Sequence, residues 1–365
     1  MRLLLMADVH LDSPFAWAGK SAGVARRQAI RDALSDGFAL ARAERVDAVC
    51  LAGDLFEHER VSRDTGRFLA DLFESVSPMR VLVAPGNHDW FGPASLYART
   101  AFPGNTTVFA KPRLVPLTLE EGFTVWGAAH TGPASTPGFL GGFRVDRGGV
   151  HVALFHGSEQ GSLPREGVEK IPHSPFTSSQ IPESGLHHAL VGHFHTPADA
   201  PFHTYPGNPE PLAFGESGAR GAVIVEVDAQ GLVSRDRRML AHTSVSDATV
   251  DVTGLAHGEA VRQAVIDELA GRTGVVRLTV TGELEQDVEL HPESWPGAVP
   301  HVESLVVRTR DLRVAHDVDL IEAEPSVRGQ FVRDVLSSGL ADEMKRKVVA
   351  TGLRAFEGRS DLEVL

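Results

Sequence analysis

The chain has 365 residues, of which 42% are hydrophobic and 23% are charged, and its formal net charge at pH 7 is −13. This length and composition are ordinary for a globular protein of about two domains, and the negative charge argues against a general affinity for polyanions. Cys50 is the only cysteine, which excludes an intrachain disulfide and a thiolate metal cluster and suggests a buried thiol.

The first predicted element is an apolar strand over residues 3–7, and Asp8 and His10 follow it directly. In an extended segment, residues two apart point to the same side, so these two side chains can face one metal ion. A strand-end aspartate beside a solvated histidine explains this pair equally well when the pair is considered alone.

Two helices and two further strands follow in alternation. Apolar residues at helical spacing predict helices over residues 24–44 and 63–76. Continuous apolar segments predict buried strands over residues 46–52 and 80–84. A strand–helix–strand–helix–strand series of this kind favours a mainly parallel sheet that helices cover.

Polar residues also follow these two strands. Asp54 comes after Gly53, which would let the backbone bend, and Asn87 and His88 come after a turn-forming Pro-Gly pair. Asparagine and aspartate favour turns for backbone reasons alone, so an ordinary turn is the simpler interpretation of the second segment in isolation. In open α/β sheets, however, ligands bind at the carboxyl ends of the strands.

The middle of the chain contains fewer clear elements. Strands are predicted over residues 123–127 and 222–227. The glycine-rich segment 131–149 predicts a long mobile loop, and long loops in compact domains are more often functional than accidental.

Three more histidines follow predicted strands later in the chain. The strand over residues 151–155 ends at His156, and the strand over 188–191 is followed by His193 and His195. This last pair has the same two-apart spacing as the first aspartate–histidine pair. A solvated pair is the alternative, but the other strand-end histidine makes that interpretation less economical.

Three parts of the chain are expected, namely residues 1–242, 243–325 and 326–365. The last part is expected to be helical, and the second part contains these predicted elements: strands over 248–252, 274–280 and 302–309 and a helix over 259–270. No apolar run approaches the roughly 20 residues of a membrane span, and the apolar start is too short for a signal peptide. We therefore expect a cytoplasmic protein that does not bind a membrane.

Seven oxygen and nitrogen donors follow the predicted strands: Asp8, His10, Asp54, Asn87, His156, His193 and His195. The set contains no sulfur, which fits Mn²⁺, iron or Zn²⁺ better than Ca²⁺ or a structural zinc site. If one carboxylate bridges, the donors make two sites of four ligands each. Two ions about 3.5–4 Å apart suit phosphoryl transfer, because they activate a hydroxide and neutralise the charge of the phosphate. His88 lies beside this set, where an imidazole can protonate the leaving alkoxide or stabilise its charge.

In these segments the chain resembles the calcineurin-like metallophosphoesterases. The resemblance covers roughly residues 1–215 and is carried by these segments in order: Asp8-Val9-His10, Gly53-Asp54, Gly86-Asn87-His88-Asp89, His156 and Gly192-His193-Phe194-His195. The Gly53-Asp54-Leu55-Phe56 segment and the C-terminal extension are similar to the SbcD-type DNA repair nucleases. The segment from His10 to Phe15 looks most like the YhaO-like branch of that group.

The resemblance implies a fold and a set of roles. The fold would be α/β, with a β-sandwich core flanked by helices and a smaller α+β capping domain over residues 243–325 that helps to position DNA. The implied roles are these: Asp8, His10 and His195 hold the first metal ion; Asn87, His156 and His193 hold the second; Asp54 bridges the two ions; and His88 is catalytic.

The resemblance also implies an activity and partners. The chain would bind two divalent ions, most often Mn²⁺ in the family, and would cleave DNA phosphodiesters as an exonuclease and single-strand endonuclease in double-strand break repair. It would form a homodimer and bind an SbcC-like coiled-coil ATPase. Relatives often carry a histidine directly after Gly-Asp-Leu-Phe, where this chain has Glu57 and then His58, so a role that depends on that histidine is not implied.

The helical segment that begins at Ser326 combines an excess of basic residues with an apolar stripe formed by Leu340, Met344 and Val348. We favour a helix that packs on its own domain and exposes a basic face to solvent. The alternative is a docking helix for the ATPase partner.

Two other functions are compatible with the same residues. One is a phosphodiesterase that acts on a small nucleotide or nucleotide-lipid substrate, because one metal site can serve many substrates. The other is a non-catalytic scaffold that binds DNA ends, although no expected ligand position is missing from the sequence.

Overall fold

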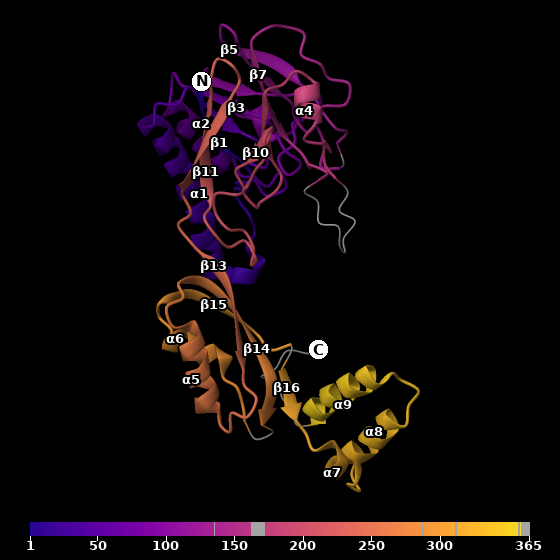
Figure 1. Ribbon diagram of the computed structural model, residues 1–365. Helices are drawn as coiled ribbons and strands as arrows, with labels where there is room; N and C mark the ends of the chain where they lie inside the picture. Colours follow the sequence, from indigo (N-terminus) through magenta and orange to yellow (C-terminus); the bar gives the residue numbers. More distant parts are fainter. Residues whose placement is uncertain (135, 162–171, 286–287, 311, 357, 359–365) are drawn as a thin grey trace. The chain divides into compact units, whose positions relative to one another are not determined.

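The computed structural model describes residues 1–134, 136–161, 172–285, 288–310, 312–356 and 358 (Figure 1). The chain divides into two compact units, Met1–Thr243 and Ser244–Leu365. All of the candidate metal ligands and His88 lie in the first unit. In the described residues, no helix combines the length and the apolar character that crossing a membrane requires.

The first sheet has six strands in the order β12-β11-β1-β2-β3-β4. Four strands run parallel in the predicted order: β1 (Arg2–Met6), β2 (Ala48–Leu51), β3 (Arg80–Val83) and β4 (Thr106–Val108). The other two are antiparallel to their neighbours: β11 (Gly221–Val227) and β12 (Val233–Met239). The prediction of a mainly parallel sheet is confirmed for the first half of the unit.

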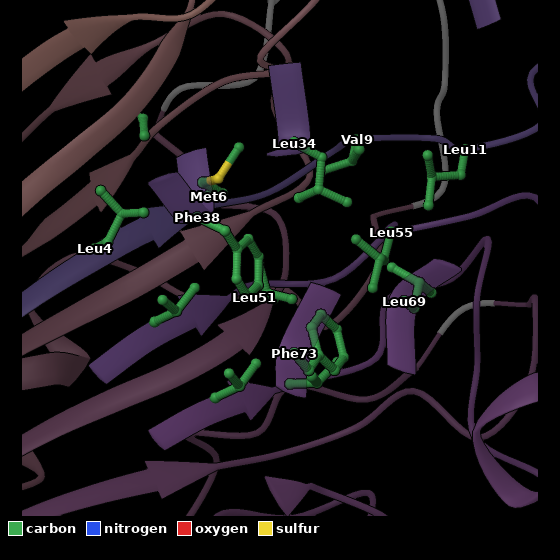
Figure 2. Packing of buried hydrophobic residues seen from close by; sticks show 14 of the residues in the cluster. Leu4, Met6, Val9, Leu11, Leu34, Phe38, Leu51, Leu55, Leu69 and Phe73 are labelled. Carbon is green, nitrogen blue, oxygen red and sulfur yellow. The ribbon is translucent and has the colours of Figure 1, made fainter. Parts of the chain in front are cut away.

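Helices cover the outer face of this sheet, as expected from the alternation of strands and helices. The covering helices are α1 (Gly19–Ala43) and α2 (Arg63–Glu74), and the short η1 (Ala16–Ala18) and α3 (Leu96–Arg99) lie in the loops. Leu34 and Phe38 of α1 and Phe73 of α2 lie in one buried cluster with Leu4 and Met6 of β1 (Figure 2). Burying one such side chain contributes about 1.5–3 kcal/mol, so this apolar layer fixes the helices on the sheet.

The second sheet also has six strands, in the order β5-β6-β7-β8-β10-β9. Its strands are β5 (Val115–Glu120), β6 (Phe123–Gly127), β7 (Val150–His156), β8 (His188–Gly192), β9 (Ala198–Asp199) and β10 (His203–Tyr205). The strands from β6 to β8 and β10 are parallel. A cluster that includes Phe139, Phe155 and Ile181 of α4 (Gln180–Glu183) covers its outer face.

The two sheets pack face to face. Leu3 and Leu5 of β1, whose neighbours Leu4 and Met6 face the helices, lie in a buried cluster with Val152 of β7 in the second sheet. Side chains alternate between the two faces of a strand, so each strand of the first sheet contributes to both layers. The predicted α/β class, with a β-sandwich core and flanking helices, is confirmed. Cys50 is buried in this inter-sheet cluster, as predicted, and its burial raises the pKa of the thiol to about 12.

The second unit contains a four-stranded parallel sheet and several helices. The strands are β13 (Val245–Asp251), β14 (Gly274–Glu285), β15 (Val302–Arg308) and β16 (Leu312–Ala315). The helices are α5 (Gly258–Leu269), η2 (Pro292–Ser294), α6 (Trp295–Ala298), α7 (Val318–Glu322), α8 (Val327–Leu336) and α9 (Asp342–Phe356). The predicted apolar face of α5, with Val261, Val265 and Leu269, is fully buried in the core of this unit.

The apolar stripe expected in the C-terminal helices is only partly buried. Val349 and Leu353 of α9 pack against α8, and Val348 lies at the edge of this cluster. Leu340 and Met344, however, have relative exposures of 45% and 49%. A helix of this segment, α9, thus packs on its own unit, as favoured from the sequence, but Leu340 and Met344 of the stripe take no part in the buried cluster.

The segment 131–149 contains no helix or strand in the part that the structure describes, residues 131–134 and 136–149. Its backbone is held at several points, for example where the N–H of Val145 donates to the carbonyl of Ser184. Phe139 and Leu140 of the predicted loop lie in the buried cluster on the outer face of the second sheet.

Candidate metal centre

The candidate ligands lie where strands of both sheets end. Asp8 and His10 follow β1, Asp54 follows β2, and Asn87 follows β3, all in the first sheet. His156 is the last residue of β7, and His193 and His195 follow β8, in the second sheet. The structure brings six of these residues together through the contacts below, although they come from two different sheets, and Asn87 directly precedes His88, whose backbone N–H binds Asp54.

The first group of donors comprises Asp8, His10 and His195, whose ligand atoms lie within 4.8 Å of one another. Each of the two imidazoles is oriented by a carboxylate: the Nδ1 atom of His10 lies 2.7 Å from Glu57, and the Nδ1 atom of His195 lies 2.6 Å from Glu216. These bonds leave the two Nε2 atoms to face the group. Carboxylate–histidine pairs of this kind are typical of metal ligands.

The Nε2 atom of His10 and the Oδ1 atom of Asn87 are buried and have no hydrogen-bond partner. Buried polar atoms without a partner are rare and costly, and each one calls for an explanation. Metal ions bound to these atoms would supply the missing interactions. The oxygen and nitrogen donors present therefore fit divalent ions, in keeping with the expectation from the sequence.

The second group of donors comprises Asp8, Asp54 and His156, again within 4.8 Å of one another. The Nδ1 atom of His156 lies 2.9 Å from the carbonyl of Ala52, so its Nε2 atom faces the group. That Nε2 atom lies 3.3 Å from the Nδ1 atom of His193, which directs His193 to the same point. Burial lowers the pKa of His193 to about 3, so this imidazole is neutral and able to bind a metal.

Asp54 lies between the two groups. Its Oδ2 atom is 3.7 Å from the Nε2 atom of His10 and 3.2 Å from the Nε2 atom of His156. Ligand atoms lie about 2.1 Å from an ion, so two ligands of the same ion are separated by about 3 to 3.5 Å. A carboxylate oxygen close to a histidine of each group is the arrangement that a bridging ligand requires.

The backbone at this site is unusual. Asp8, His10 and Asp54 have φ angles of 54°, 52° and 53°, and His193 has a φ of 116°. Residues other than glycine rarely adopt positive φ, and such strain clusters at functional sites. Gly86 is required for close packing, because a Cβ atom there would lie 2.2 Å from the Oδ1 atom of Asp54.

Asp89 holds the loops of the first sheet in place. Its buried carboxylate accepts the N–H groups of Asp54, Leu55 and Gly86 at 3.0, 2.7 and 2.6 Å and the hydroxyl of Tyr97 at 2.6 Å. Burial raises the pKa of Asp89 to about 6. The sequence placed Asp89 directly after Asn-His but assigned it no role; the position beside His88 was the only signal.

His88 lies next to the donors, with 46% of its side chain exposed. The backbone N–H of His88 donates to the Oδ1 atom of Asp54 at 2.8 Å. The Nδ1 atom of its ring lies 2.9 Å from the Oε2 atom of Glu57. This hydrogen bond to Glu57 raises the pKa of His88 to about 9. The imidazole is therefore protonated at neutral pH, with its Nε2 atom left for a substrate.

Glu57 contacts both His88 and the expected ligand His10, one with each carboxylate oxygen. Burial acts to raise its pKa, but the hydrogen bonds from the two imidazoles lower it to about 2. The sequence identified Glu57 only as a departure from a related family. Glu216 plays the equivalent part for His195, and nothing in the surrounding sequence indicated it.

Replacing Glu57 by glutamine is expected to lower the rate of phosphodiester hydrolysis about 10- to 100-fold without changing the metal content. The amide keeps the size of the side chain but can accept a hydrogen bond from only one of the two imidazoles. Because Glu57 raises the pKa of His88, its loss should lower that pKa. Steady-state rates across neutral and alkaline pH check this, and the decline in rate should move to lower pH.

The matched control is Glu59→Gln, because Glu59 is exposed and has the same charge. A Glu57→Gln protein that binds one metal ion fewer would contradict the positioning role. It would make Glu57 a ligand, which its grouping with His10 and His88 within 4.8 Å also allows.

Comparison with known proteins gives a family and two relatives. A model of the calcineurin-like phosphoesterase family matches residues 1–197. The chain is 28% identical over 307 residues to the uncharacterized metallophosphoesterase YhaO of Bacillus subtilis, a match that covers 76% of this chain and 70% of that protein. It is 26% identical over 275 residues to the DNA double-strand break repair protein Mre11 of Methanopyrus kandleri, covering 64% of this chain and 55% of that protein. The match thus spans little more than half of the archaeal relative.

Proposed function

This chain belongs to the calcineurin-like phosphoesterase family, and from that premise we propose that it is a two-metal DNA nuclease of the SbcD type. Membership of the wider family confirms the resemblance seen in the sequence and makes the chain a metallophosphoesterase. The observation that carries the narrower proposal is the pair of donor groups that share Asp8 and adjoin His88. The relative named as a DNA double-strand break repair protein supports a polynucleotide substrate.

The ligands divide between two ions in this proposal. Asp8, His10 and His195 hold the first ion, and the second is held by Asn87, His156 and His193, with Asp54 between the two. Two divalent ions, of which Mn²⁺ is the expected one, supply Lewis acidity that activates water and offsets the charge of the phosphate. Asp8 also accepts the N–H of His193 at 3.0 and 3.1 Å, which fixes the loop that carries the histidine pair.

His88 acts as the general acid in this proposal. Glu57 holds the Nδ1–H of His88 and thereby fixes the ring, so the Nε2 atom can give a proton to the leaving oxygen of the cleaved bond. The proton comes from the imidazole, which Glu57 keeps charged at neutral pH. The exposed side of His88 is where the leaving strand would lie.

Incubation with an end-labelled linear duplex and with closed circular single-stranded DNA tests the proposal. We expect Mn²⁺-dependent cleavage that a chelator abolishes, because every catalytic step depends on the metal centre. Cleavage of the circle would add endonuclease activity to exonuclease activity. Turnover of bis(p-nitrophenyl) phosphate without cleavage of either DNA would contradict a nuclease and favour a small nucleotide substrate, a function that the net charge of −13 also suits. DNA binding without any hydrolysis would instead favour the scaffold.

A coiled-coil ATPase and a second copy of this chain are the proposed partners. Leu340 and Met344 support the first, because they are exposed in the C-terminal segment that carries an excess of basic residues. Truncation after Pro325 is expected to abolish co-purification with the ATPase while DNA cleavage by the remaining chain continues. Undiminished co-purification would place the contact elsewhere.

A further inference from the structure

A cavity of about 420 Å³ lies between α2 and α3 in the first unit. Its lining includes the side chains of Arg63 and Arg67 from α2 and Arg99 from α3. The two helices approach closely because Gly66 lacks a side chain: a Cβ atom there would lie 2.9 Å from the hydroxyl of Thr100. The cavity is within the size range of sites for small ligands or for one unit of a polymer.

The residues that line this cavity carry three positive charges. In the described part of the chain, no carboxylate lies within ion-pair distance of Arg63, Arg67 or Arg99. Asp64, which follows Arg63, is engaged with Arg31 of α1 at 2.9 Å. Arg63 and Arg67 lie one helical turn apart, where like charges repel each other. A bound anion would reduce this repulsion between the arginines. The cluster is notable because the whole chain has a net charge of −13.

The lining also defines the chemical class of the anion. Guanidinium groups bind phosphate through paired N–H donors, and the hydroxyl of Thr100 adds a further donor. Val61 and Leu96 add apolar surface beside these donors. A phosphate group attached to an organic unit fits this combination better than a free inorganic ion.

The wall of the cavity continues directly from the metal centre. The N–H of Val61 donates to the carbonyl of Glu57 at 2.9 Å, and the carboxylate of Glu57 binds His88. Between them lies His58, whose N–H donates to the carbonyl of His88 and whose ring stacks on Trp90 with centroids 3.9 Å apart. Burial and the positive charge of Arg99 both lower the pKa of His58.

We propose that this cavity binds a backbone phosphate of a nucleic-acid strand whose neighbouring phosphodiester lies at the metal centre. A polynucleotide presents a phosphate at every unit, so a strand held at His88 would offer further phosphates along this wall. The His58–Trp90 stack between the two sites is a surface on which a base could lie. This inference rests on the proposed function, because it names the part of a polynucleotide that a small substrate would lack.

The test compares R63Q/R67Q/R99Q with R42Q/R45Q/R80Q. The control removes the same number of charges from exposed arginines near the amino ends of β2 and β3, whereas the candidate metal ligands follow the carboxyl ends of the strands. Binding of a fluorescein-labelled single-stranded oligonucleotide is measured by anisotropy at several salt concentrations, with a chelator present to prevent cleavage. Unfolding temperature and metal content show whether each protein is folded.

We expect the cavity variant to bind about tenfold more weakly or worse, with a smaller dependence of affinity on salt. The slope of log K against log salt should fall by about 0.7 for every phosphate contact that is lost. The control should lose much less. If the triple variant does not fold, the single variants R63Q, R67Q and R99Q replace it, because all three side chains are exposed; each should reduce the slope by one contact.

Two results would overturn the proposal. Equal losses in both variants, or none in the cavity variant, would show that the arginines act only through overall charge or not at all. A wild-type protein that turns over bis(p-nitrophenyl) phosphate but neither binds nor cleaves DNA would refute the proposed nuclease function and this inference with it. The wild-type measurement therefore separates the two failures.

Discussion

Replacing His88 by alanine is expected to slow DNA cleavage about 10²- to 10⁴-fold while two metal ions per chain remain bound. The reason is that the ring of His88 contacts Glu57, while only its backbone N–H binds the Oδ1 atom of Asp54, and the ring lies outside the two groups that contain Asp8. Removing it should leave the ligands in place and take away only the proton donor. Single-turnover cleavage of DNA and metal analysis of the purified protein measure the two effects.

A comparison of leaving groups sharpens this test. The alkoxide that leaves from DNA needs a proton, whereas 4-nitrophenolate leaves without one. The loss in His88→Ala should therefore be much larger for DNA than for bis(p-nitrophenyl) phosphate. His291→Ala is the control, because His291 lies in the second unit with 66% of its side chain exposed. Equal losses on both substrates would contradict the role of His88 as general acid, and a loss of metal would make it a ligand.

Replacing Asp54 by alanine is expected to remove both metal ions and to abolish hydrolysis. The Oδ2 atom of Asp54 lies 3.7 Å from His10 and 3.2 Å from His156, so one side chain serves both groups. Loss of a shared ligand weakens both sites, because the charge that holds the two ions together is lost. Metal content after equilibration with Mn²⁺, measured beside the wild type, gives the result.

His10→Ala provides the matched comparison for this variant. In the proposed arrangement His10 belongs to the first ion only, so its removal should leave about one ion per chain. Asp64→Asn, at a position where 70% of the side chain is exposed, controls for the loss of a carboxylate. Full metal content in Asp54→Ala would contradict bridging, and the loss of a single ion would assign Asp54 to one site.

The signals in the sequence that indicate the candidate ligands are local. Apolar runs followed by Asp8, Asp54 and His156 mark the carboxyl ends of parallel strands, and such ends meet at one edge of a sheet. The structure brings these residues within 4.8 Å of one another even though they belong to two sheets. The exchange of hydrogen bonds between loops, as in the contact of Asp8 with His193, accounts for that convergence.

The residues that were missed act only through the folded chain. Three carboxylates are identified only by the partners that they bind in the folded chain. Glu216 binds His195, Asp89 binds a set of backbone N–H groups, and Glu57 binds a pair of histidines. No periodicity or spacing marks a carboxylate of this kind. The exposure of Leu340 and Met344 was not predicted for a different reason: helical spacing predicts an apolar face but does not say which neighbour covers it.

Because the candidate ligands come from two sheets, metal binding would affect the stability of the folded chain. Asp8 and His10 come from one sheet and His195 from the other, so an ion held by all three would link the two sheets where these strands end. A ligand that binds the folded chain alone adds about 2.7 kcal/mol to its stability at a concentration a hundred times its dissociation constant. Chelation should then loosen the seam between the sheets before it affects either sheet itself. Metal supply in the cell would thus govern the lifetime of the protein as well as its activity.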